Sequence, residues 1–333
     1  MYEAITDVPG IKVGHYTDVE AATGCTVVLC EEGAVAGVDV RGSSPGTRDT
    51  ELLRPMNQVQ NVHAILLSRG SSFGLDAAAG VMRYLEERGK GYKIADTIVP
   101  IVPAAILFDL AIGNPKVRPG PMEGYQACIS AKGAMVPEGC VGAGTGAMVG
   151  QLMGTERATK SGLGTTSEKI ANDVIVAAII AVNSLGDVID PKTGKVLAGI
   201  RRLDGKGFAK TIELMKQGYR YLAEPGGNTT IGVVATNALL SKEQVNKVAQ
   251  MAHDGMARAI NPCHTMLDGD TIFALSTGQQ ECDITTVGSM AAEVLCRAIV
   301  RAVTQAVSLA SVPAASSVLG VGVKSKTARG IPS

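Results

Sequence analysis

The sequence contains no tryptophan, and aromatic residues of all kinds make up only 3% of its 333 residues. It has no excess of charge of either sign, because 31 Lys and Arg balance 31 Asp and Glu. A neutral chain without a basic face is a poor partner for nucleic acid, so we expect no such partner. The core must be built from aliphatic residues and from close backbone approaches at some of the 40 glycines.

Three further absences narrow the class of protein. The most apolar late segment, 287–311, carries Glu293, Arg297 and Arg301, so it predicts a core helix and no membrane span. The N-terminal residues lack the basic and apolar blocks of a signal peptide. The seven cysteines are odd in number and form no Cys-x-x-Cys pair. This pattern favours reduced thiols in a cytoplasmic protein.

Along the chain, short β-rich runs alternate with segments in which apolar residues recur at helical spacing. The segment 24–42 predicts a hairpin around Glu31-Glu32-Gly33, and 63–89 predicts a strand, a Gly/Ser loop and a helix. Helices are also expected over 241–260 and 287–311. No repeat or linker divides the chain, so we expect a single domain over residues 1–333 with layered α+β packing.

Two clusters of small and polar residues leave several interpretations open. "VGAGTGAMVG" has the glycine spacing of a dinucleotide site at Gly142 and Gly144, but no strand-like run precedes it. The glycines favour instead a close approach of backbone N–H groups to a substrate or oxyanion, or tight packing. "CHTMLDGDTIF" groups His264, Asp268 and Asp270. These are too few oxygen ligands for a calcium loop, so they indicate either a capped turn or a pair of carboxylates that orients a nucleophile.

The stretch "EPGGNTTIGVVATNALL" places Asn228 and Thr229 directly before a β-branched run. A threonine hydroxyl in mid-chain has no base beside it. If the chain is cut before Thr229, the new α-amine, with a pKa of about 7.7–8, can take the hydroxyl proton within the same residue. Gly226 and Gly227 permit the backbone strain that an acyl shift onto Thr229 needs. The pattern is equally consistent with a plain turn followed by a strand.

Seven segments in this order resemble the self-cleaving aminopeptidases and amidases. That family includes the L-aminopeptidase D-Ala-esterase/amidases, the β-peptidyl aminopeptidases and the nylon-oligomer (6-aminohexanoate oligomer) endo-hydrolases, and the Asn-Thr junction and Asp-Gly-Asp segment are most similar to the last group. The resemblance spans nearly the whole chain. The segments are "DVPGIKVGH", "VHAILLSRGSSFGLDAAAGV", "GAGTGA", "KSGLGT", "AVNSLGDV", "GNTTIGVVATN" and "HTMLDGDT".

The resemblance implies a four-layer αββα sandwich of the N-terminal-nucleophile type. It implies cleavage between Asn228 and Thr229 into an α chain, 1–228, and a β chain, 229–333, that stay together, as a homotetramer of αβ units. Thr229 is then the nucleophile, Asn183 the oxyanion donor, and Asp268 and Asp270 the neighbours of the new amine. No metal or organic cofactor is needed. The expected activity is hydrolysis of linear amide bonds in peptides or 6-aminohexanoate oligomers through an acyl-threonine.

The chain departs from the family pattern at two positions in the expected substrate site. Gln151 stands where the nylon-oligomer hydrolases have a lysine, and Phe108 where related enzymes have a tyrosine. Lys160 lies near Gln151 in sequence but in a different column, and Gly144 belongs to the glycine-rich segment between them. A neutral glutamine supplies no cation, although it can donate a hydrogen bond.

Three other functions remain open at this stage. An aminopeptidase acting on small or β-amino N-terminal residues would require a free substrate amine. An acyltransferase of the ornithine acetyltransferase type would pass the acyl group to an amine, but its Ala-Thr-Met-Leu junction is absent here. A binding protein on the same scaffold would remain a single intact chain.

Overall fold

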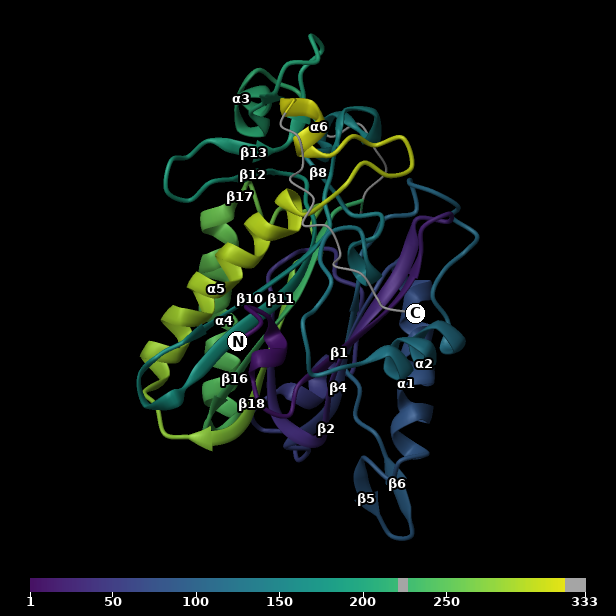
Figure 1. Cartoon of the computed structure of the whole chain (residues 1–333), viewed down its shortest axis with the longest axis vertical. Helices are drawn as coiled ribbons and strands as arrows, with labels where there is room; N and C mark the ends of the chain where they lie inside the picture. Colours follow the sequence, from purple (N-terminus) through teal and green to yellow (C-terminus); the bar gives the residue numbers. More distant parts are fainter. Residues whose placement is uncertain (221–226, 321–333) are drawn as a thin grey trace, which may run out of the picture.

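A nine-stranded mixed sheet forms the centre of the computed structural model, which describes residues 1–220 and 227–320 (Figure 1). Gly226 of the predicted junction and the C-terminal residues 321–333 lie outside the described residues. The strand order is β10-β11-β16-β18-β2-β4-β7-β3, and β1 pairs with β2. The strands are β1 (Lys12–Asp18), β2 (Thr23–Val40), β3 (Thr47–Arg48), β4 (Asn61–Ser68), β7 (Ala104–Ile106), β10 (Leu163–Lys169), β11 (Ile175–Asn183), β16 (Thr229–Ala238) and β18 (Thr271–Gln280).

Strand β2 runs unbroken through the residues for which the sequence predicts a hairpin. The hairpin prediction is wrong: β2 pairs with β4 on both sides of Glu31-Glu32-Gly33, with a register shift between Leu29 and Ala34. Gly33, at φ +90°, takes the left-handed conformation that this bulge needs. The bulge lets one strand serve two parts of the sheet, because its first half pairs with β1 and its second half with β18.

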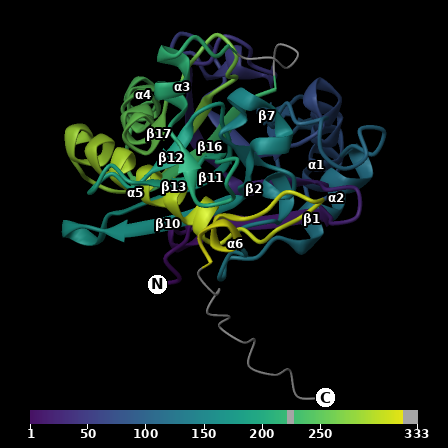
Figure 2. The ribbon, with the colours of Figure 1, turned by 90° about the horizontal axis from the view of Figure 1, so that it is seen from above.

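Four layers result because helices cover the outer faces of the two sheet halves (Figure 2). On one side α5 packs on β10 and β11, and α4 on β18 and β2; on the other side α1 and α2 pack on β1, β2 and β4. Side chains of β11 alternate between the layers, since Ala178 and Ile180 face the helices α4 and α5 while Ile179 and Ala181 face the apolar core between the sheet halves. The αββα sandwich expected from the sequence is confirmed.

The three predicted helices are present as α1, α4 and α5, with shifted ends, whereas the sequence did not predict α2, α3 and α6. These helices are α1 (Ala77–Glu86), α2 (Pro121–Ser130), α3 (Thr211–Lys216), α4 (Lys242–Ala259), α5 (Ile284–Thr304) and α6 (Ala315–Leu319). Ser241 caps α4 by accepting a hydrogen bond from Gln244 N, as its place before the apolar period indicates. The helices in the described part of the chain include none that is long and apolar enough to cross a membrane.

Short two- and three-stranded sheets accompany the nine-stranded sheet. The hairpin β12–β13 follows β11, and Pro100 and Pro103 lie in the gap between β6 and β7. These short sheets are β5 (Tyr92–Ile94) with β6 (Thr97–Val99), β8 (Met148–Val149) with β9 (Thr159–Lys160), β12 (Asp187–Ile189) with β13 (Val196–Ala198) and β17 (Ile260–Asn261), and β14 (Ile200–Arg201) with β15 (Phe208–Ala209).

Candidate functional site

Thr229 is the first residue of β16, a strand buried along its whole length near the middle of the sheet. It pairs with Asn183, the last residue of β11, and the preceding Asn228 forms a bridge with Asp268. The run of β-branched residues after Thr229 favours a strand, and the sandwich buries both of its faces. The fold therefore brings together residues from three segments that lie far apart in the sequence.

The Thr229 hydroxyl lies against the peptide bond that precedes it. Its Oγ1 donates to the carbonyl oxygen of Asn228 at 2.5 Å. Gly269 N donates to the same oxygen at 3.1 Å. A side chain at position 269 would not fit, because a Cβ there would lie 2.8 Å from Thr229 Oγ1 and 2.6 Å from Ser44 O. A main-chain donor thus points at the carbonyl of the expected cleavage site. Sequence reasoning missed Gly269, although a glycine between two aspartates was a signal.

Both carboxylate oxygens of Asp270 accept hydrogen bonds, whereas only one oxygen of Asp268 does. Asp270 accepts from Thr230 N at 2.9 Å through Oδ1, and from His264 N at 3.0 Å and His264 Nδ1 at 2.8 Å through Oδ2. Asp268 Oδ2 accepts from Thr265 N and Thr265 Oγ1 at 2.8 and 2.5 Å. Asp268 Oδ1 is buried and bonds to no described residue. Burial and the charge of Asp270 raise the pKa of Asp268 to about 6, although the Thr265 bonds act the other way.

His264 is the second residue whose contribution the sequence did not reveal. Burial lowers its pKa, but the hydrogen bonds and charges of Asp270 and Cys263 outweigh burial and raise the pKa of His264 to about 10. It therefore carries a positive charge at neutral pH. Its ring packs edge-on against His253, with 4.8 Å between the ring centres. Burial lowers the pKa of His253 to about 4, so that neighbour stays neutral.

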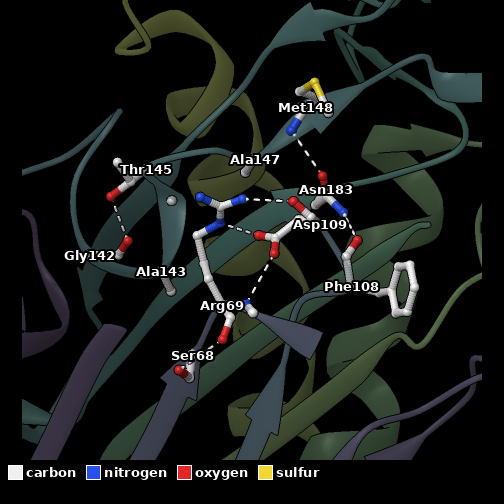
Figure 3. A network of polar contacts seen from close by, with 12 residues as sticks. Ser68, Arg69, Phe108, Asp109, Gly142, Ala143, Thr145, Ala147, Met148 and Asn183 are labelled. Carbon is white, nitrogen blue, oxygen red and sulfur yellow. Dashed lines mark hydrogen bonds and ion pairs between the residues drawn. The ribbon is translucent and has the colours of Figure 1, made fainter. Parts of the chain in front are cut away.

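The amide of Asn183 is held on both sides. Its Oδ1 accepts from Met148 N at 3.0 Å and from Gln151 Nε2 at 3.2 Å. Its Nδ2 donates to Phe108 O at 3.2 Å and to Gly227 O at 3.3 Å. Figure 3 shows the Asn183 side chain between Met148 and Phe108. Its nitrogen therefore faces the chain just before the junction, and Phe108 contributes its carbonyl group to this contact.

Lys160 and Gly144 lie in a separate, structural cluster. Lys160 Nζ is buried and donates to two carbonyl oxygens of the glycine-rich segment, at 3.4 Å to Gly144 and 2.9 Å to Ala147, and to the adjacent Ser161 O at 2.5 Å. Burial lowers its pKa to about 8. Gly144 packs against the backbone, since a Cβ there would lie 2.2 Å from Leu163 N. Among the described residues, no hydrogen bond joins Lys160 or Gly144 to Thr229, and Gly144 allows close backbone packing.

A buried ion pair supports the loop that holds Asn183. Arg69 Nε pairs with Asp109 Oδ2, and Arg69 Nη2 donates to Asp109 O at 3.1 Å (Figure 3). Asp109 follows Phe108, whose carbonyl receives Asn183 Nδ2. A side chain at Gly146 would lie 2.2 Å from the guanidinium. The glycine-rich segment therefore packs directly against Arg69 at Gly146. Among the described residues, no group of three His, Cys, Asp or Glu side chains could hold a metal ion.

Comparison with known proteins finds a family model and relatives that match most of the chain. The model described as peptidase family S58 matches residues 3–325. An uncharacterised aminopeptidase of Mycobacterium leprae is 44% identical, over 93% of this chain and 92% of its own. A 6-aminohexanoate-oligomer endohydrolase of a Kocuria species is 30% identical, over 89% of this chain and 84% of its own.

Solved structures agree on the fold. The L-aminopeptidase D-Ala-esterase/amidase of Ochrobactrum anthropi, described as a variant of the Ntn hydrolase fold, aligns with a TM-score of 0.70 at 20% identity, over 92% of this chain and 86% of its own. A β-aminopeptidase of a Burkholderia species aligns with a TM-score of 0.66 at 20% identity, over 96% of this chain and 93% of its own. The resemblance noted in the sequence is confirmed.

Proposed function

Because this chain belongs to peptidase family S58 and is therefore a hydrolase of amide bonds, we propose that it cuts itself before Thr229 and then uses this residue as an N-terminal nucleophile. The observation that carries the proposal is the geometry at the junction. The Thr229 hydroxyl and the Gly269 N–H both point at the carbonyl oxygen of Asn228. The hydroxyl thus lies beside the carbon that it must attack.

Maturation is an acyl shift followed by hydrolysis. Thr229 Oγ1 attacks the carbonyl carbon of Asn228, and the negative charge that develops on the Asn228 oxygen is stabilised by Gly269 N–H. The bond from that carbon to Thr229 N breaks, and the hydroxyl proton ends on this nitrogen. An ester remains between Asn228 and the Thr229 hydroxyl. Water hydrolyses the ester, which leaves a carboxylate on Asn228 and a free α-amine on Thr229.

Catalysis repeats the same steps on a substrate amide. The α-amine of Thr229 takes the hydroxyl proton and later gives it to the leaving amine. Asn183 Nδ2, which already donates to carbonyl groups beside the junction, supplies a hydrogen bond to the substrate oxyanion. Asp268 Oδ1, which bonds to no described residue, accepts from the new ammonium group. The acyl-threonine is released by water, and none of these steps calls for a metal or a cofactor.

The substrate class follows from the relatives. One relative is named for 6-aminohexanoate oligomers, so we propose linear amides of peptides or of such oligomers as substrates. The second candidate is an aminopeptidase, which the name of the more similar relative favours. The 6-aminohexanoate dimer and trimer, each with a free and with an acetylated amine, separate the two. An aminopeptidase cleaves only the free forms. The acyltransferase alternative is tested by adding hydroxylamine and measuring how much of the acyl group it receives in place of water.

The direct test of the nucleophile uses three variants at two positions of β16. Thr229→Ala removes the hydroxyl, so we expect a single full-length chain and no amide hydrolysis above background. Thr229→Ser should still cleave. Thr236→Ala, further along β16, is the matched control and should cleave and hydrolyse as the wild type does. A Thr229→Ala protein that still cleaves at this junction, or retains activity, would refute the proposal. The assembly state, predicted as a tetramer of αβ units, is measured by light scattering on the same samples.

A further inference from the structure

Three oxygen atoms surround the side-chain nitrogen of Gln151. It donates to Met148 O at 3.2 Å, to Asn183 Oδ1 at 3.2 Å and to Ser184 O at 3.5 Å, and the side chain is only 5% exposed. Two of these oxygens are main-chain carbonyls, which can only accept. The NH₂ group of the Gln151 carboxamide, and not its oxygen, must therefore face these three oxygen atoms.

This contact decides which way the amide of Asn183 points. Asn183 is fully buried, and a flip would set its oxygen against the carbonyls of Phe108 and Gly227. The flip would also turn its NH₂ group toward two donors, Met148 N–H and the Gln151 NH₂. The two donors on one side and the two acceptors on the other therefore select a single orientation. In that orientation Nδ2 faces the junction.

The backbone around Gln151 is fixed independently of its side chain. Gln151 N donates to Leu185 O at 3.1 Å, and Gly150 N donates to Gly186 O at 3.0 Å. Gly150, at φ +71°, sits so close to the next layer that a Cβ would lie 2.3 Å from Gly199 C. A change of the Gln151 side chain should therefore leave this segment in place and alter mainly the contact with Asn183.

We infer that Gln151 is a positioning residue, which holds Asn183 Nδ2 toward the reacting carbonyl by donating to Asn183 Oδ1. The inference rests on the proposed role of Asn183 at the oxyanion. Gln151 performs this role without a charge, so the role itself does not depend on pH. Loss of the donor leaves Met148 N–H as the remaining described donor to Asn183 Oδ1. We expect kcat to fall about 10- to 100-fold, less than for loss of an oxyanion donor itself, with KM little changed.

Three substitutions of Gln151 separate donation from mere packing. Gln151→Met keeps the length but has no donor, so it should be slow at every pH. Gln151→Lys places three N–H donors among three acceptors and should restore most of the lost rate. Gln151→Glu is the informative case. Its ionised form has no donor, whereas its protonated form has one O–H. Burial among oxygens raises the pKa of such a carboxyl above its ordinary value of about 4.3.

The rate of Gln151→Glu relative to wild type should therefore rise as the pH is lowered from 8 to 5. The ratios for Gln151→Met and for the exposed control Gln217→Glu should stay flat. Precursor conversion and kcat for amide hydrolysis are measured over this range, with thermal unfolding to check folding. Wild-type rates in Gln151→Met, or equal pH profiles for the Glu and Met variants, overturn the inference. If neither of these variants folds, a folded Gln151→Lys with more than a tenfold loss overturns it. A wild-type chain that never cleaves defeats the proposed function instead.

Discussion

Charge is divided unequally between the two aspartates beside Thr229. Asp270 receives three hydrogen bonds, two of them from His264, whose raised pKa keeps it charged at neutral pH. Asp268 has one oxygen without a described partner and a raised pKa. The positive His264 therefore compensates Asp270. In our account the ammonium group of a newly formed N-terminus compensates Asp268.

The His264–Asp270 pair predicts a pH-dependent stability. The folded-state pKa of His264 lies near 10 and its ordinary value is 6.5. The stabilisation is thus complete below pH 6.5 and disappears as the pH rises toward 10. His264→Gln should cost about 1.5–3 kcal/mol at pH 6, and the difference from wild type should shrink by pH 10.

Urea unfolding at a series of pH values measures this difference. His63→Gln is the control from about pH 7 upward, because burial lowers the pKa of His63 in the folded state and the ordinary imidazole pKa of about 6.5 leaves it mostly neutral in the unfolded state. Its difference from wild type should not change between pH 7 and 10. A His264→Gln effect as large at pH 10 as at pH 6 would show that the charge contributes nothing.

At the residue scale, the sequence identified the reactive side chains more readily than the main-chain groups and contacts around them. Thr229 and the two aspartates stand out because their residue types carry recognisable chemistry. Gly269 and Met148 act through main-chain N–H groups, which every residue except proline possesses, so their residue types do not reveal this role. The only signal was the position of Gly269 between two aspartates. Lys160 was a candidate for the substrate site. Its burial among carbonyl groups is visible only when the glycine-rich segment is folded around it.

Among the elements, β2 shows how a turn signal can mislead. Glu31-Glu32-Gly33 is polar and contains a glycine, which is the composition of a hairpin turn and also of a bulge. The decision between them depends on β4 and β18, which pair with β2 and follow it in the sequence. Helices α4 and α5 were predictable because their apolar period is long and capped. Their contact with each other was not.

The crossing of α4 and α5 depends on a glycine. A Cβ at Gly255 of α4 would lie 2.1 Å from Ala292 O on α5, and backbone atoms cannot yield as a flexible side chain does. Gly255→Ala should therefore destabilise the protein by about 1–3 kcal/mol, although alanine is the better helix former. Gly133→Ala is the control, since its nearest contact is 3.7 Å from Ile11 O. Thermal unfolding compares the two, and an unchanged midpoint for Gly255→Ala would contradict this packing.

For the whole molecule, the proposed cut falls inside the sheet and not between domains. The smaller chain would contain β16, β18, α4 and α5, and the larger chain β2 and β11. Strand β16 pairs with β11 and β18 pairs with β2, so each chain would supply strands to the other. Apolar residues from both chains also pack together in each of the two main apolar clusters. The proposed cleavage would therefore remove one peptide bond without separating the layers that the two chains share.

The cleaved protein should behave as one cooperative unit. We expect the two chains to elute together in 1 M NaCl, because backbone hydrogen bonds and apolar contacts join them and salt screens neither. Denaturant should unfold both in a single transition, seen alike by circular dichroism and by size. Separation of the chains in salt alone, or two resolved transitions, would indicate two domains.

Whether Thr229 becomes an N-terminus can be read from an intact-mass spectrum of the purified protein, combined with N-terminal sequencing of its chains. We expect two chains in equal amounts, the smaller beginning Thr-Thr-Ile-Gly at residue 229. A single full-length chain that persists on long incubation, or a smaller chain that begins at another residue, would contradict the proposed cleavage.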